Sequence, residues 1–334
     1  MRKLAVILML IVTVSSCFEE DIMVPRHEQG DLLEGIASQG SSYERQVFYD
    51  LQTNREVSSN LISEWDLCFE KSGGLMSIRL NSSKFMWAGN SYDTAFLDII
   101  DRADLEMRFD RSDGDPDSTA IGTWFDPESE TVSSLEHVYL VDRGIDIDSS
   151  NTSNSSMGFR KVQFRTENND FLVRHANPDN TDEITSSISW DGGADRVYYS
   201  FDNGIVEIEP GPTGWSLLFS RYTTMLFYNE GEPYPYLVTG VLLNPSGVSA
   251  TLDTIHDFPA IELADTVDLE FTFRSDVIGY EWKYYNFDDD VYTIEPGMAY
   301  VIRDRDGLYY KLRFIDFYND TGEKGHPTFE YVRL

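Results

Sequence analysis

The side chains that could carry chemistry in this chain are few and scattered. Its five histidines do not have the spacing of a recognisable metal-ligand pair: His27, His137, His175, His256 and His326. Each is therefore interpreted first as a surface or capping imidazole. The sequence lacks a Gly-rich phosphate loop, His-Glu-x-x-His and Gly-x-Ser-x-Gly, and it offers no Cys-His pairing. We predict that the protein is not an enzyme.

Carboxylates are the abundant ionisable groups, with 58 Asp and Glu against 26 Lys and Arg. The resulting formal charge of −32 repels phosphate backbones, so we predict no nucleic-acid partner. The loop from Asp110 to Asp117 holds four of these acids. Oxygen-rich turns can hold calcium, but the Gly and the closing Glu are not at EF-hand positions here. A calcium site and a solvated acidic loop are the two interpretations.

The first residues have the anatomy of a secretory signal. Arg2 and Lys3 precede an apolar run over 4–14, which is too short to span a membrane. The Val-Ser-Ser sequence before Cys17 resembles the bacterial lipobox, in which the cysteine becomes the first, lipidated residue of the mature protein. An ordinary cleaved signal with a chance cysteine is the alternative. We predict a signal peptide over 1–16 and a lipidated tether over 17–43.

Lipidation of Cys17 has two consequences. The segment 18–21, Phe-Glu-Glu-Asp, resembles the acidic signal that sends some Gram-negative lipoproteins to the outer face of the outer membrane. We therefore expect a cell-surface protein that contacts the outer membrane only through its lipid anchor. A lipidated Cys17 also leaves Cys68 as the single remaining cysteine, without an intrachain disulfide partner. Because Cys68 lies in an apolar strand, we interpret it as a structural side chain.

The elements that must position any site are strands, and they occur twice. Residues 65–69 and 215–219 both alternate Trp, Leu and Phe with other residues, which is the pattern of a strand with one buried face. Residues 47–51 and 197–201 match at the same interval of 150. Further matched segments follow in the same order: 76–80 with 224–228, 121–124 with 278–282, 138–143 with 299–304, and 161–164 with 311–314. We infer a duplicated unit.

The spacing of the strands defines the fold class. Turn residues recur every eight to twelve positions or so, helical periodicity is weak throughout, and 334 residues suit about two domains. We predict an all-β protein of two tandem, related β-sandwich or open-barrel units of antiparallel strands. The units are placed at 44–193 and 194–334, with the boundary near the Gly-Gly pair at 192–193.

Several of these segments resemble the HmuY-like proteins. The likeness rests on the Trp-Asp-Leu-Cys-Phe strand at 65–69, on 300–314 and on the terminal segment 322–330. That family comprises surface or secreted lipoproteins of Gram-negative bacteria that capture haem and have an all-β fold. The resemblance covers about residues 44–334 and implies a hemophore-like role in haem and iron acquisition. It also implies that an outer-membrane receptor or transporter takes over the haem. The duplication departs from the single-unit members.

The resemblance directs attention to haem ligands. Haem iron takes axial donors, usually His or Met, and its propionates need cations or solvent. We select His256, in a loop between strands, and Met225 as candidate axial ligands. The candidate partners of the propionates are Arg221, Lys283 and Arg303. No other metal site is predicted.

A second function remains open, namely a surface lipoprotein module that binds a glycan or an outer-membrane partner protein. The tyrosines at 198–199, 234–236 and 284–285 could stack on a porphyrin or on a sugar. Because the repeated strands are interpreted as structural, we expect the ligand in the loops where the two copies differ.

Overall fold

The computed structural model describes residues 29–72, 75–129, 132–146, 155–167, 170–190, 195–228 and 231–334. Cys17 and the predicted signal peptide lie outside these residues. Within the described ranges, the regular elements are antiparallel strands and short 3-10 helices, and no helix has the length and hydrophobicity to cross a membrane. The predicted all-β fold of antiparallel sandwich units is confirmed.

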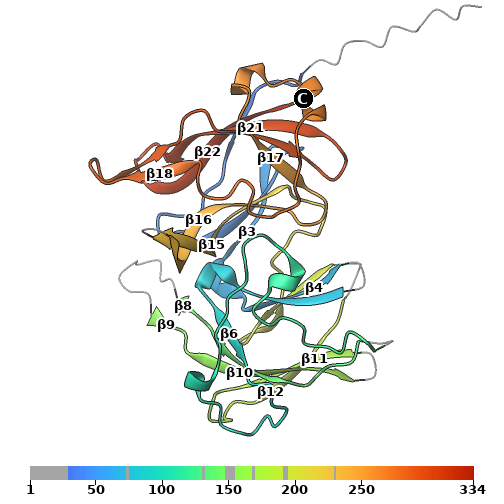
Figure 1. The fold of residues 1–334 in the computed structure, drawn as a ribbon. Helices are drawn as coiled ribbons and strands as arrows, with labels where there is room; N and C mark the ends of the chain where they lie inside the picture. Colours follow the sequence, from blue (N-terminus) through green and yellow to red (C-terminus); the bar gives the residue numbers. More distant parts are fainter. Residues whose placement is uncertain are drawn as a thin grey trace, which may run out of the picture.

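The first sandwich, in the lower part of Figure 1, consists of a five-stranded and a four-stranded sheet. The five-stranded sheet has the order β12 (Ile184–Ile188), β11 (Asp170–Ala176), β10 (Phe159–Glu167), β7 (Val138–Asp142), β6 (Trp87–Asn90). The four-stranded sheet has the order β14 (Gly204–Val206), β13 (Arg196–Ser200), β4 (Leu67–Ser72), β5 (Leu75–Leu80).

The second sandwich, in the upper part of Figure 1, also consists of a five-stranded and a four-stranded sheet. Its five-stranded sheet has the order β1 (Leu33–Ile36), β22 (Lys324–Arg333), β21 (Tyr309–Tyr318), β20 (Ala299–Arg303), β17 (Ser249–Asp253). Its four-stranded sheet has the order β16 (Glu232–Leu243), β15 (Leu217–Tyr228), β2 (Arg45–Asp50), β3 (Arg55–Leu61).

Short elements complete the two sandwiches. Two small hairpins are formed by β8 (Ile145–Asp146) with β9 (Ser155–Ser156) and by β18 (Lys283–Asn286) with β19 (Val291–Ile294). The 3-10 helices are η1 (Ile62–Glu64), η2 (Ser82–Lys84), η3 (Arg102–Asp104), η4 (Pro116–Ser118), η6 (Phe258–Ala260) and η7 (Leu263–Val267).

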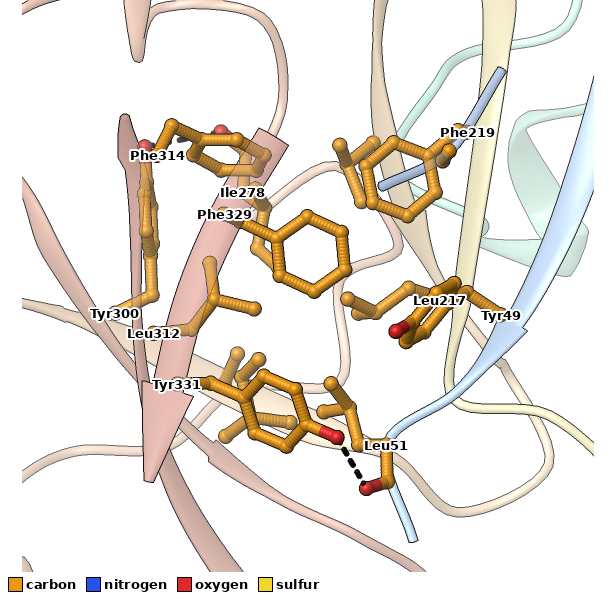
Figure 2. Close-up of a cluster of buried hydrophobic side chains, with 14 of the residues drawn as sticks. Tyr49, Leu51, Leu217, Phe219, Ile278, Tyr300, Leu312, Phe314, Phe329 and Tyr331 are labelled. Carbon is orange, nitrogen blue, oxygen red and sulfur yellow. Dashed lines mark hydrogen bonds between the residues drawn. The ribbon is translucent and has the colours of Figure 1, made fainter. Parts of the chain in front are cut away.

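Each sandwich encloses an apolar core between its own two sheets. In the second core, Phe219 of β15 stacks on Phe329 of β22, with ring centroids 5.4 Å apart (Figure 2). In the first core, Phe69 of β4 meets Phe164 of β10 edge-on at 6.0 Å. Burial of one such side chain contributes about 1.5–3 kcal/mol. The period-two alternation in the sequence thus corresponds to side chains that face these cores.

Strands from distant parts of the chain combine in each four-stranded sheet. β2 pairs with β15, and β13 pairs with β4. Tyr49 lies opposite Leu217, and Tyr199 lies opposite Leu67, so the two pairings have equivalent registers at the interval of 150 residues. Each sandwich therefore contains strands from both sides of the predicted boundary at 193/194. The ranges 44–193 and 194–334 describe the repeat in the sequence, and duplication itself remains an inference.

The chain enters the fold earlier than the predicted tether over 17–43 implied. β1 pairs with β22, and Ala37 and Gln39 just after it are buried. A strand of four residues has no readable period, and its partner stands near the other end of the sequence. Local alternation therefore could not indicate β1.

One matched pair of segments is not structurally equivalent. Residues 224–228 form the end of β15 and not a separate strand corresponding to 76–80. The counterpart of β5 is β16, because Leu80 faces Leu67 as Leu243 faces Leu217. β15 contains no Gly, Pro, Asn or Asp that would mark its interior, so the sequence does not show that 224–228 continue the strand that begins at Leu217.

The two four-stranded sheets also contact each other and join the sandwiches. A buried cluster of outward-facing side chains forms this contact: Phe48, Trp65, Cys68, Ile208 and Trp215. Cys68 is a free, buried thiol, and burial raises its pKa well above its usual range. A thiol in this state is protonated and unreactive, which agrees with its interpretation as a structural side chain.

Candidate ligand-binding groove

A groove of about 750 Å³ is lined by residues of both sandwiches. The first sandwich contributes Trp87 on β6 and the segment with Met107 and Phe109, and the second contributes Met225 and Phe227 near the end of β15. Its volume is in the range of small-molecule and cofactor sites. We call it the inter-sandwich groove.

The apolar wall of the groove has a simple origin in β15. This strand is long, and its last residues extend past the core of the second sandwich. Met225 and Phe227 are two positions apart and therefore lie on the same face. They are 39% and 70% exposed, respectively. Large apolar side chains that stay exposed together are a feature of binding surfaces.

The facing wall comes from the first sandwich. Trp87 meets Phe109 edge-on, with ring centroids 5.0 Å apart. Met107 also lines the groove, and its Sδ lies against Gly89 of β6, where a Cβ atom would come within 2.8 Å of the sulfur. Gly89 therefore leaves the room that this thioether occupies. Aromatic rings and sulfur atoms thus occur on both sides of the groove.

The polar rim is formed by two copies of the tripeptide Arg-Ser-Asp, one at 111–113 and the other at 274–276. Ser112 Oγ donates to Asp276 Oδ2 at 2.7 Å, and the backbone N–H of Ser275 donates to the carbonyl oxygen of Asp113 at 2.8 Å. The two tripeptides therefore bind each other across the boundary between the sandwiches.

Both arginines of these tripeptides line the groove. Arg274 donates to Asp276 from Nε and Nη2 at 3.1 and 3.0 Å. Arg111 Nε lies 3.5 Å from Asp113 Oδ2. The side chains of Arg111 and Arg274 are 69% and 57% exposed, so both guanidinium groups remain accessible to a ligand.

The acidic loop at 110–117 uses its carboxylates to order its own backbone. Asp113 accepts a hydrogen bond from the N–H of Asp115, which in turn accepts one from Asp117. Asp110 is buried and accepts from the N–H groups of Leu80 and Ala120, while burial raises its pKa to about 6. No cluster of three or more potential metal-ligating His, Cys, Asp or Glu occurs in the described ranges. In the structure, these carboxylates accept hydrogen bonds from backbone N–H groups, as expected for an acidic loop that orders its own backbone.

The two predicted axial ligands lie in different places. Met225 lines the groove. His256 follows β17 and is not among the groove residues; its Nδ1 is 3.0 Å from Asp253 Oδ2. The hydrogen bond to Asp253 raises the pKa of His256. Metal-ligating histidines also often have a carboxylate partner of this kind, so this contact does not distinguish the two roles. Of the two predicted ligands, Met225 is the one that lines the inter-sandwich groove.

The predicted propionate partners are not groove residues either. Lys283 is buried, donates to the carbonyl of Thr239 at 2.6 Å, and has its pKa lowered to about 7 by burial. Arg221 is largely buried beside the contact between the sheets, and burial lowers its pKa to about 10. Arg303 is exposed on β20.

The other described histidines each have a neighbour elsewhere. His137 contacts Asn90 and His326 contacts Ser38. His175 is buried with its Nε2 3.0 Å from the Tyr199 hydroxyl, and burial lowers its pKa to about 4. None of these three histidines lines the inter-sandwich groove.

The groove residues that were missed in the sequence include Met107, Arg111 and Arg274. Met107 stands in an irregular segment without a period, and its place on the groove depends on tertiary contacts. The arginines did have a readable signal, because Arg-Ser-Asp occurs once in each half of the chain. A search for short repeats in the loops, and not only in the strands, would have found them.

Comparison with known proteins gives one family match. Residues 264–331 match the model of the HmuY protein family. This segment begins within η7, includes Arg274 and Asp276 of the groove, and ends in β22. It also includes 300–314, one of the segments on which the resemblance was based. The match therefore agrees with the predicted resemblance to the HmuY-like proteins over this part of the chain.

Solved structures add a distant likeness. The apo HmuY analog TFO from Tannerella forsythia is 10% identical, with a TM-score of 0.33, covering 92% of this chain and 99% of that chain. Apo PinO from Porphyromonas gingivitis is 9% identical, with a TM-score of 0.33, covering 91% and 99%. Likeness at this level carries no argument about a site. Among curated proteins, none matches the chain.

Proposed function

We propose that this protein binds haem in the inter-sandwich groove and serves haem and iron acquisition. One observation carries the proposal: the groove places the thioethers of Met107 and Met225 together with three aromatic rings. Apolar and aromatic walls suit a flat porphyrin, and Met sulfur is an axial ligand of haem iron in proteins. The family match to HmuY protein supports the same ligand.

Residues of both sandwiches would contact the haem. Met225 would supply a thioether to the iron because its side chain is exposed on the groove, and Met107 would supply one from the facing wall. Trp87, Phe109 and Phe227 would cover the porphyrin and exclude water from the iron. This arrangement calls for binding and orientation, and no group in it is assigned a catalytic step.

A haem titration tests the proposal. Addition of ferric or ferrous haem to the purified protein should shift the Soret band and saturate at one haem per chain. Met225→Ala should weaken binding by at least about tenfold and alter the spectrum, because an iron ligand is lost. His256→Ala is the matched control and should bind like the wild type. An unchanged Soret band in both redox states would refute haem binding.

We also propose that the protein is lipid-anchored at Cys17 on the outer membrane and delivers haem to an outer-membrane receptor or transporter. The Val-Ser-Ser-Cys sequence and the acidic residues after it support this location. Metabolic labelling with a fatty acid should mark the wild type, while Cys17→Ser should be unlabelled and released from the membrane fraction. Equal membrane association of both proteins would contradict the anchor.

A second candidate function is supported by exposed aromatic side chains outside the groove. Tyr236 on β16 is 52% exposed, Tyr284 on β18 is 46% exposed, and Phe287 in the following turn is 86% exposed. Such rings can stack on a sugar or pack against a partner protein. A glycan array and co-purification from outer membranes would detect these ligands, and binding unaffected by Met225→Ala would assign it to this surface.

A further inference from the structure

Cations and carboxylates line the groove in equal number, which is a higher share of cations than in the chain as a whole. Arg108, Arg111 and Arg274 line it together with Asp113, Asp117 and Asp276, whereas acids outnumber bases by 58 to 26 overall. Arg108 is paired with the exposed Glu106, whereas Arg111 and Arg274 each pair with a largely buried aspartate of their own tripeptide. A negatively charged ligand approaching so acidic a surface requires a local site of this kind.

The two tripeptides position their arginines reciprocally. Asp276 receives two donors of Arg274 and also the hydroxyl of Ser112 from the other sandwich. The carboxylate is therefore held from both sides, and it orients the guanidinium at the rim. Guanidinium groups bind carboxylates through paired N–H donors, which a lysine cannot reproduce.

We propose that Arg111 and Arg274 each bind one of two carboxylates on the ligand, so that the groove selects a porphyrin diacid over its neutral diester. Asp276 and Ser112 are positioning residues that act through Arg274. The inference rests on the proposed function, since it names the ligand groups that the same groove recognises. It assigns one arginine to each sandwich and therefore makes binding dependent on the contact between them.

Metal-free porphyrins test the inference separately from iron ligation. Quenching of tryptophan fluorescence would measure the affinities of the full-length protein for protoporphyrin and for its dimethyl ester. The diacid should bind at least about tenfold more tightly than the diester. Arg111→Gln and Arg274→Gln should each weaken diacid binding about tenfold, and the double variant about a hundredfold. Diester binding should change less than about twofold.

Conservative variants separate positioning from general damage. Asp276→Asn should weaken the diacid alone, and Asp276→Glu should recover part of the loss because it restores an acceptor for Arg274. Arg305→Gln, which alters an arginine beside Asp306 outside the groove, is the control and should bind both porphyrins normally. Equal wild-type affinity for diacid and diester would overturn the inference, and so would equal losses for both ligands in the arginine variants.

The outcomes also distinguish this inference from haem binding itself. Diacid selectivity without a haem-induced Soret shift would retain the carboxylate site and reject haem as the ligand. A Soret shift without diacid selectivity would retain haem and reject the arginine pair. Failure to bind either porphyrin or haem would overturn both.

Discussion

At the contact between the two four-stranded sheets, equivalent positions carry a neutral side chain in one case and a charged one in the other. Gln46 and Arg196 are 150 residues apart and occupy the same register position, next to β15 and β4 respectively. Gln46 donates to Ser220 Oγ at 3.2 Å and accepts from the indole N–H of Trp65 at 2.8 Å. Arg196 instead binds Glu70, at 3.2 Å. We call these regions the neutral end and the charged end.

The charged end is a buried ion cluster. Arg196 binds Glu209 through two hydrogen bonds of 2.7 Å, and Arg79 binds Glu70 at 2.7 Å. Burial opposes ionisation of Glu70, but Arg79 and Arg196 outweigh it and lower its pKa. The same backbone contact therefore accepts either neutral hydrogen bonds or ion pairs. The difference teaches that fold equivalence does not require equivalent polar chemistry, provided the buried ions are paired.

The largest expected effect is at the charged end. Arg196→Met leaves the buried Glu209 without its two guanidinium donors, so the free energy of unfolding should fall by about 3–5 kcal/mol. Urea denaturation followed by tryptophan fluorescence would measure it. A loss below about 1 kcal/mol would show that water or another group replaces the arginine.

A combined variant tests whether charge is needed there at all. Glu70→Ser, Arg79→Gln, Arg196→Gln and Glu209→Asn together replace all four ions of the cluster with neutral groups like those of the neutral end. This protein should be more stable than Arg196→Met, because removing a whole ion cluster avoids an unpaired buried charge. Lower stability than the single variant would contradict the equivalence of the two ends.

A smaller effect is expected at the neutral end. Gln46→Leu removes the acceptor of the Trp65 indole and the donor to Ser220, so unfolding should become about 1–3 kcal/mol easier. The same urea denaturation would measure it. The loss in free energy of unfolding should be smaller than for Arg196→Met, because Gln46→Leu leaves no unpaired buried ion. An equal loss would contradict the distinction between the neutral end and the charged end.

The smallest net effect is expected in the pH dependence, because His175 and Asp110 change stability in opposite directions as the pH falls. His175 in the first sandwich faces Val162, where the second has Tyr331 facing Leu312. Because burial lowers the pKa of His175 to about 4, the unfolded chain binds the additional proton, and stability should fall from about pH 6.5 to pH 4. His175→Gln should remove this decline, as measured by thermal unfolding across the range.

Asp110 supplies the opposing control. Burial raises its pKa to about 6, so the folded protein binds the proton more tightly and stability should rise as the pH falls through 6. In the His175→Gln protein this rise should become visible, and Asp110→Asn should abolish it. An unchanged decline in His175→Gln would assign the acid sensitivity to other groups.

The groove shows how far sequence reasoning reached. Met225 was selected from the sequence and lines the groove, but His256 was selected equally and lies apart from it. The sequence could not rank these two candidate ligands, because whether a side chain can reach a bound ligand depends on its tertiary surroundings. Met107 had no signal of its own. Arg111 and Arg274 had one, a repeated tripeptide, which only gains meaning once the tripeptides are seen to bind each other.

The sequence by itself determined the all-β sandwich class and the matched apolar faces of the longer strands, because side-chain alternation is a local property of each strand. It did not determine β1 or the extent of β15. Tertiary structure decided that β2 pairs with β15 and β13 with β4. Matched strands have nearly the same apolar face and register, so alternation cannot choose between their partners. That choice brings both sandwiches to one groove, with a thioether and an arginine from each.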